Sequence, residues 1–183
     1  MSCSFKLKIF KNVITSGGGQ HFNLDLKKAL FDAIGNDEEL AMALISQSKD
    51  FNLPLNEANE YNQTPLLWAC GLEKPDIAKA ILKKFYDQDI TIKEQDEYGW
   101  TPFLWACKNG WTTIVAEMVE KKRTFKFDVN AKDKRGITGF ILACKEKQIR
   151  VINLLMAKSE DLKIDLQAKD CYGRSGFDYL SPR

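Results

Sequence analysis

The 183-residue sequence contains a single histidine, His21, and this scarcity removes most enzyme chemistry from consideration. His21 follows Gly17-Gly18-Gly19-Gln20, which we interpret as a linker because it lacks the Gly-Lys-Ser/Thr end of a phosphate-binding loop. A serine or cysteine nucleophile therefore has no histidine base in a folded part of the chain, and histidine-based metal binding is equally unsupported. We predict a protein that is not an enzyme and that holds no metal or cofactor.

The sequence also lacks long apolar runs, a strong net charge and paired cysteines. No apolar run approaches the ~18 residues of a membrane span, and a net charge of +2 gives no argument for nucleic-acid binding. The five cysteines are an odd number without a Cys-x-x-Cys pair, which indicates a reducing compartment. We predict a cytoplasmic protein without membrane or nucleic-acid partners. The basic, acid-free first 24 residues leave a mitochondrial presequence as the alternative, although they contain no arginine.

What the sequence does contain is a repeated heptapeptide. Residues 64–70 read TPLLWAC and residues 101–107 read TPFLWAC, a spacing of 37 residues. The same step of 37 leads to Thr138, which opens TGFILAC, and then to Ser175, which opens SGFDYL. Four copies at one fixed spacing predict an array of structural repeats.

One copy can be translated into local structure. Thr101 is a good helix N-cap and Pro102 suits the first helical position, where a missing N–H costs nothing. Gly110 can take the left-handed conformation that ends this short helix, and apolar residues at helical spacing over residues 112–119 predict a second helix. Each unit is therefore a turn, a short helix, a reversal and a second helix, and stacked neighbours bury the apolar faces.

The apolar positions keep this register along the chain. The apolar positions predict a repeat domain over residues 24–183, and the lysines and glycines before it predict a basic arm and glycine linker over residues 1–23. The domain divides into a capping unit (24–50), three repeats (about 51–87, 88–124 and 125–161) and a partial last repeat (162–183) that lacks its second helix.

Extended segments between the helices also repeat every 37 residues. Apolar residues alternate with polar ones at Phe125, Phe127 and Val129, and again at Leu162 and Ile164. Alternation with period two is typical of a strand with one buried side. We expect these segments to be strand-like.

These residues resemble the ankyrin repeat, whose mark is T-P-L-H-x-A. Thr64-Pro65-Leu66 and Thr101-Pro102-Phe103 carry its first part, and its alanine is matched at Ala69, Ala106 and Ala143. The resemblance covers about residues 25–183 and implies an all-α solenoid of stacked helix-turn-helix units with short hairpin turns. It also implies a concave binding surface made by the turn tips and the first helices.

The sequence departs from the family in three ways. The motif histidine is replaced by Leu67, Leu104 and Ile141, so we expect less rigid turns, and Gly139 and Gly176 replace proline, which should weaken two helix starts. The repeat of 37 residues exceeds the family's typical 33. We expect a second helix about one turn longer or a longer return strand, and the alternating pattern partly favours the strand.

Two residue ladders have structural interpretations. Cys70, Cys107 and Cys144 recur every 37 residues. We interpret them as small buried side chains between neighbouring helices, too far apart for disulfides. Trp68 and Trp105 lie on the first helices, and we interpret them as core residues.

Other aromatic and charged residues predict where a partner binds, because turn aromatics are not required by the fold and are enriched in binding hot spots. The tips also change from acidic (Glu57, Glu60, Glu94, Asp96, Glu97) to basic (Lys132, Lys134, Arg135, Lys169, Arg174), with Asp133 and Asp170 among the latter. For the aromatic residues, the open alternative is that the rings merely cover the hairpin backbone. For the charges, it is that their change along the array is random. The predicted partner-binding residues along one groove are Tyr61, Tyr98, Trp100, Lys108, Lys134, Arg135, Lys145 and Tyr172.

We therefore predict a non-catalytic protein–protein interaction module, an adaptor or scaffold that binds a partner along its concave groove. The alternative is a permanent structural subunit of a large assembly. It would be held by the arm, whose SFKLKIF alternates apolar and basic residues and could add to a sheet edge, and by an uncapped C-terminal end.

Overall fold

The computed structural model describes residues 26–50 and 52–181. The arm and linker predicted for residues 1–23 lie outside these residues. The chain divides into two compact units between Lys84 and Phe85. In the described part, the regular elements are helices, accompanied by one isolated bridge between Lys169 and Ser175.

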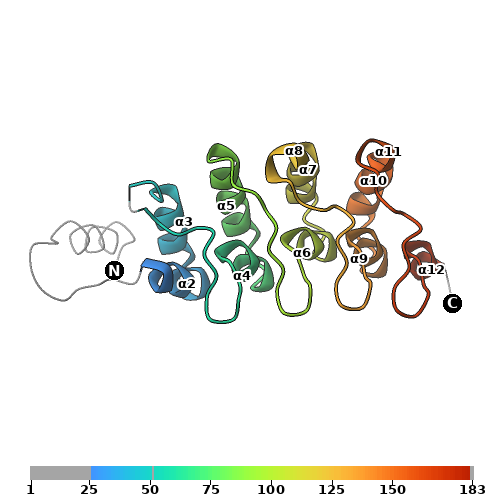
Figure 1. The fold of residues 1–183 in the computed structure, drawn as a ribbon, viewed down its shortest axis with the longest axis horizontal. Helices are drawn as coiled ribbons and strands as arrows, with labels where there is room; N and C mark the ends of the chain where they lie inside the picture. Colours follow the sequence, from blue (N-terminus) through green and yellow to red (C-terminus); the bar gives the residue numbers. More distant parts are fainter. Residues whose placement is uncertain (1–25, 51, 182–183) are drawn as a thin grey trace, which may run out of the picture. The chain divides into compact units, whose positions relative to one another are not determined.

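The first unit contains α2 (Leu26–Asn36), α3 (Glu38–Ser46), α4 (Pro65–Gly71) and most of α5 (Pro75–Asp87) (Figure 1). Helix α2 packs against both α3 and α4. An edge-to-face contact between Phe31 and Trp68, with ring centroids 6.4 Å apart, joins α2 to α4. Asp37 caps α3 by accepting the Leu40 N–H at 3.1 Å.

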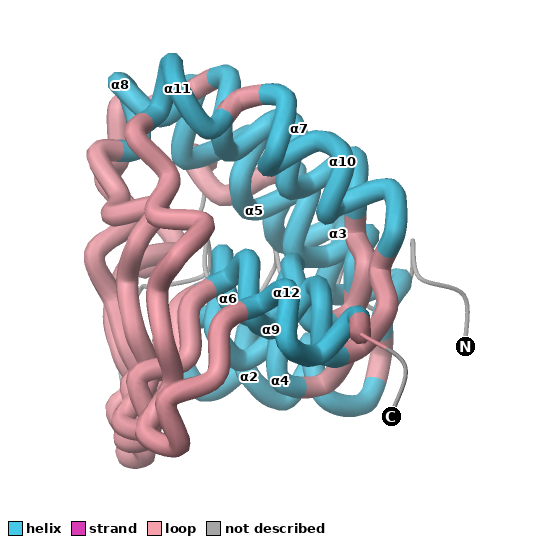
Figure 2. Tube along the Cα trace, turned by 90° about the vertical axis from the view of Figure 1, so that its right-hand side faces the viewer, coloured by secondary structure: helices cyan, strands magenta, loops and turns pink. Residues whose placement is uncertain are grey.

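The second unit repeats the same pair of helices twice and begins it a third time. Its helices are α6 (Pro102–Lys108), α7 (Thr112–Glu120), α8 (Lys122–Phe125), α9 (Gly139–Lys145), α10 (Ile149–Ala157), α11 (Ser159–Leu162) and α12 (Gly176–Leu180). Helix α9 packs between α6 and α12, while α7 packs against α10. Figure 2 shows these two helical layers, with the connecting loops gathered along one side. We call α6, α9 and α12 the first helices of this unit.

The short helices begin where the repeated threonines predict. The hydroxyl oxygens of Thr64, Thr101 and Thr138 accept the N–H three residues on, at 3.3, 3.2 and 3.3 Å. Ser175 closes a capping box with Asp178, whose carboxylate accepts the Ser175 N–H at 2.7 Å. These caps satisfy backbone N–H groups that a helix leaves unpaired at its start.

The glycines that replace proline stand where two first helices approach closely. A Cβ at Gly139 would lie 2.8 Å from a ring carbon of Phe103 and 2.9 Å from the Cys107 sulfur. A Cβ at Gly176 would similarly meet Phe140 at 2.7 Å and Cys144 at 3.0 Å. The glycines therefore make room for a bulky ring, and the structural interpretation of Cys107 and Cys144 as buried side chains between helices is confirmed.

The expectation of strand-like segments is wrong for the second unit. The residues in excess of the family's repeat form the single turns α8 and α11, which end at left-handed Lys126 (φ 49°) and Lys163 (φ 54°). Phe125 itself is helical, because its N–H donates to Lys121 O at 3.0 Å instead of to a neighbouring strand. The one-sided burial holds, since Phe125, Phe127 and Val129 are buried. The alternation of apolar and polar residues thus predicts which side chains are buried but not the strand pairing of their backbone.

Candidate interaction surface

Each hairpin turn is closed by an acidic or amide side chain that recurs every 37 residues. Asp96 is an example: its Oδ1 accepts the N–H groups of Tyr98 and Trp100, both at 2.9 Å. The same pair of bonds is made by Asn59, Asp133 and Asp170. From the sequence, Asp96, Asp133 and Asp170 are predicted only as charges of the tips, although their constant spacing of 37 residues indicates a structural role.

Main-chain bonds complete the same turns. The Asp96 N–H donates to Trp100 O at 3.0 Å, and the Asp133 N–H donates to Ile137 O at 3.1 Å. Gly99, at φ 81°, takes the conformation that suits glycine, and a Cβ there would also lie 3.2 Å from the backbone of Asp133. The turns are therefore bonded by their own Asx side chains and main chain without the motif histidine. That they are less rigid than in the family stays a prediction.

Neighbouring turn tips in the second unit are bonded to one another. The Lys134 N–H donates to Tyr98 O at 3.0 Å, and the Cys171 N–H donates to Arg135 O at 2.8 Å. Four of the predicted residues (Tyr98, Lys134, Arg135 and, beside Cys171, Tyr172) therefore stand in one row, which we call the tip row. The side chains of Tyr98 and Tyr172 are 62% and 72% exposed.

Trp100 lies differently from a free tip aromatic. Its ring is 4.6 Å from that of Trp105, and it packs against a buried cluster that includes Leu104 and Ile141. The Lys108 ammonium lies 4.8 Å from the Trp105 ring and 5.8 Å from the Trp100 ring. We call Trp100, Trp105 and Lys108 the tryptophan ledge; the structure brings two predicted residues together there.

The interpretation of Trp68 and Trp105 as core residues needs correction, because both side chains are only half-buried. Trp105 instead lies partly exposed on α6, where its ring contacts that of Trp100. Lys145, the position 37 residues after Lys108, is exposed at the last residue of α9.

A second cation–aromatic cluster lies at the last turn and was missed from the sequence. The Arg174 guanidinium sits 4.7 Å from the Tyr172 ring and 4.6 Å from the Tyr179 ring, and it donates twice to Asp170 Oδ2, at 3.0 and 3.2 Å. The Tyr179 hydroxyl also donates to Asp170 Oδ2, at 2.6 Å. The sequence does place Tyr179 at the repeat position of Trp105, 74 residues later, which indicates a second aromatic residue at the same place on a first helix.

The electrostatics of this cluster favour an ionised Asp170. Burial by itself would raise the pKa of this carboxyl, which belongs to a residue only 6% exposed. The hydrogen bonds from Tyr179, from the backbone N–H groups of Arg174 and Tyr172, and from the Arg174 side chain outweigh it and hold the pKa far below its usual range. The negative charge of Asp170 is therefore stabilised by groups of the last turn and of α12.

Tyr61 belongs to the first unit. Its side chain is 66% exposed and lines an open hollow of about 730 Å³. Phe31 and Trp68 contribute aromatic surface to this hollow, and Asp32 and Lys28 contribute charges. The exposed Tyr61 ring thus lies beside α2 and α4 of its own unit.

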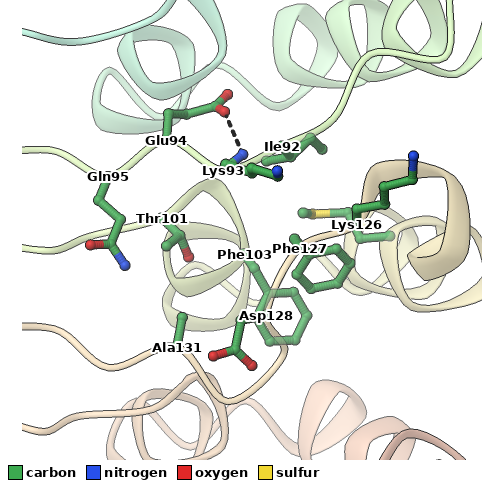
Figure 3. Close-up of a pocket in the computed structure, with 11 residues that line it drawn as sticks. Ile92, Lys93, Glu94, Gln95, Thr101, Phe103, Lys126, Phe127, Asp128 and Ala131 are labelled. Atoms are coloured by element: carbon green, nitrogen blue, oxygen red, sulfur yellow. Dashed lines mark hydrogen bonds between the residues drawn. The ribbon is translucent and has the colours of Figure 1, made fainter.

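A smaller cavity lies on the loop side of the second unit (Figure 3). It has a volume of about 260 Å³ and lies between the loops around Ile92 and Phe127. The rings of Phe103 and Phe127, 5.0 Å apart, line it together with Met118. Figure 3 also shows the Lys93 N–H donating to the Glu94 carboxylate, a bond of 2.9 Å.

The described residues offer little reactive chemistry. Burial raises the pKa of the Cys144 thiol to about 11 and that of Cys107 still further, so both remain protonated and unreactive near neutral pH. Among residues 26–50 and 52–181, no group of histidine, cysteine or acidic side chains is arranged to hold a metal ion. In the same part of the chain, no helix has the length and apolarity needed to cross a membrane.

Comparison with known proteins decides the family. Residues 88–170 match the family model for ankyrin repeats, in three copies. These residues are ankyrin repeats. No curated protein matches the chain significantly in sequence.

The ankyrin match covers the tryptophan ledge and most of the tip row, and ends at Asp170 of the last turn. Together with the helices of the second unit, it confirms the predicted family for residues 88–170 and the all-α repeat fold of that unit. Ankyrin repeats generally mediate protein–protein interactions, and domains made of them are typically non-catalytic.

Proposed function

We propose that this chain is an adaptor that holds a partner protein against the tip row and the first helices of its second unit. The observation that supports this most directly is the tryptophan ledge, where two indole rings and a lysine are assembled beside the row of tips. Large aromatic and cationic side chains contribute most of the binding energy at protein interfaces.

The exposure of the tip tyrosines argues against a merely structural role. A ring that covered the hairpin backbone would be buried by it, whereas Tyr98 and Tyr172 are 62% and 72% exposed. The hairpins are already closed by Asp96, Asp133 and Asp170 through backbone bonds that involve neither ring. The tyrosine rings are therefore available to a partner.

Lys134, Arg135 and Lys145 complete the proposed surface. All three side chains are exposed, the first two in the tip row and the third at the end of α9. Tyr61 is proposed to bind the same partner from the first unit, through the aromatic hollow that it lines.

Site-specific photo-crosslinking in cells tests this proposal. A photoreactive phenylalanine analogue replaces Tyr98 or Tyr172, and Ile149 serves as the matched control because its side chain is similarly exposed (58%) on the second-helix layer. We expect one partner protein to be crosslinked from both tyrosine positions and not from Ile149. Crosslinking from Ile149 alone would contradict the proposed surface.

The permanent-subunit alternative is based on the arm, residues 1–23, which lie outside the described residues, and on the partial last repeat. Membership of a large assembly and the cytoplasmic location both remain predictions from the sequence.

A further inference from the structure

We infer that the segment bound by the second unit is an acidic, extended stretch of a partner protein. This inference rests on the proposed function, and it adds the chemistry of the partner. The observation behind it is that the tip row exposes basic side chains, whereas the carboxylates of the same turns are buried.

The acidic residues of the third and fourth turns face inward. Asp133 and Asp170 are each only 6% exposed, and both accept backbone N–H groups within their turns. Asp170 is further neutralised by Arg174 at 3.0 Å. The carboxylates of these two turns therefore face inward, and they are not part of the outward surface of the tips.

The basic residues of the same turns face solvent. Lys134 and Arg135 are exposed, as are Lys132 and Lys169. Among the described residues, none of the ion pairs involves Lys134, Arg135 or Lys145. The exposed acidic residues among these turns and first helices include Glu97 in the tip row, Glu146 after Lys145, and Asp178, whose carboxyl interacts with Lys169. The exposed cations Lys132, Lys134, Arg135, Lys145 and Lys169 remain in excess.

The first helices extend the positive surface inward from the tips. Lys108 and Lys145 occupy the last residues of α6 and α9, where a cation is favoured by the helix dipole. Lys108 is also oriented by the two indole rings beneath its ammonium group. A carboxylate that reaches Lys108 would also bring its neighbouring side chains onto the tryptophan ledge.

The repeat spacing suggests the pattern of the bound segment. Packed helices lie about 8–10 Å apart, and an extended chain advances about 3.3–3.6 Å per residue. Acidic residues about every third position would therefore match successive units. The three first helices of this unit would accommodate a segment of about eight residues.

Binding of two fluorescent peptides to the full-length protein tests the inference. Both have about eight residues with leucine and phenylalanine at shared positions, and every third position is glutamate in one and lysine in the other. We expect the glutamate peptide to bind at least about ten-fold more tightly, and its affinity to fall as salt is raised, because exposed charges are screened.

Two double variants locate the effect. Lys134→Glu with Arg135→Glu should weaken binding of the glutamate peptide by about ten-fold or more. Lys83→Glu with Arg150→Glu makes the same change in net charge at exposed residues of second helices and should leave binding unchanged. Lys145→Gln provides an independent milder variant at an exposed helix end. Thermal unfolding of each variant shows whether the fold is kept.

Several results would overturn the inference. Equal binding of the two peptides, or equal loss in both double variants, would show that specific acidic recognition is absent. Tighter binding of a single-stranded RNA of equal charge would point to nucleic acid instead. If neither peptide binds while Tyr98 and Tyr172 still crosslink a protein, the acidic chemistry is wrong and the proposed function stands.

Discussion

Two neighbouring pairs of loops in the second unit are built to the same plan but joined differently. Between the loops that contain Asn130 and Lys163, the Asn130 amide donates to Lys163 O at 2.8 Å and accepts the Asp165 N–H at 2.9 Å. Lys122 adds a bond to Leu162 O at 3.2 Å. The side chains of Asn130 and Lys122 thus both bridge this loop pair, which we call the bridged pair.

The preceding pair, which we call the open pair, has Lys93 at the position equivalent to Asn130. It is joined by a main-chain bond from Ile92 N to Phe125 O at 2.7 Å, and the cavity of about 260 Å³ lies beside it. A lysine has no acceptor and cannot reproduce the two bonds of an asparagine. The repeat length therefore sets the path of the loops, while single residues decide how firmly adjacent loops are joined.

The largest change would come from the helices beneath the loops. Gly139→Ala would place a Cβ within 2.8 Å of Phe103, which also lines the cavity of the open pair. We expect the free energy of unfolding to fall by about 1–3 kcal/mol because the packed core must shift. Urea unfolding measures this, with Gly71→Ala as the control, because a Cβ there meets no atom within 4 Å and Gly71 does not have a positive φ. Equal losses in both variants would refute the packing explanation.

The period of 37 residues made the helices, their threonine caps and the buried cysteine ladder predictable from the sequence. It did not reveal whether the alternating segments pair as strands, because one-sided burial is common to strands and to packed loops. The Phe125 N–H to Lys121 bond that decides this is local and helical.

The candidate surface was predictable only in part. Tyr98 and Tyr172 are exposed turn residues, as their positions predicted. The position of Trp105 on a first helix predicted burial in the core, but in the folded unit its ring is partly exposed and contacts Trp100 of the preceding turn. Arg174 and Tyr179 were missed because their role arises from a shared contact with Asp170.

Removing the Asn130 bridge should make the bridged pair resemble the open pair. Asn130→Ala deletes both side-chain hydrogen bonds at a partly exposed site, so we expect a loss of about 1 kcal/mol in the free energy of unfolding. Hydrogen exchange should also show faster exchange of the Asp165 N–H. Unchanged exchange at Asp165 would mean that the amide bridge does not hold this pair.

Adding an asparagine to the open pair is the converse change. Lys93→Asn should raise the free energy of unfolding by about 0.5 kcal/mol, since a bridge to the loop at residues 126–128 becomes available. Urea unfolding beside Lys93→Gln, which is less well matched in length, measures it. A loss of stability in Lys93→Asn would show that the two pairs differ in more than this residue.

The pH dependence of stability extends the comparison to the last turn. The folded-state pKa of Asp170 lies below that of an unfolded aspartate, about 3.9, so the folded state binds fewer protons. The contribution of Asp170 to the free energy of unfolding is therefore present above about pH 4 and declines as the pH falls further. Asp170→Asn should flatten this acid-side decline in urea unfolding, and Tyr179→Phe should do so in part. An unchanged acid profile in Asp170→Asn would contradict the assignment.

The measurement that tests the proposed surface most directly is the affinity of the crosslinked partner for two single variants. Trp105→Ala removes part of the tryptophan ledge, and Ile149→Ala removes an apolar side chain exposed on the other helical layer. We predict at least about a thirty-fold loss of affinity for Trp105→Ala, as for an interface hot spot, and none for Ile149→Ala. Full affinity in Trp105→Ala together with a loss in Ile149→Ala would place the partner on the other layer and contradict the account.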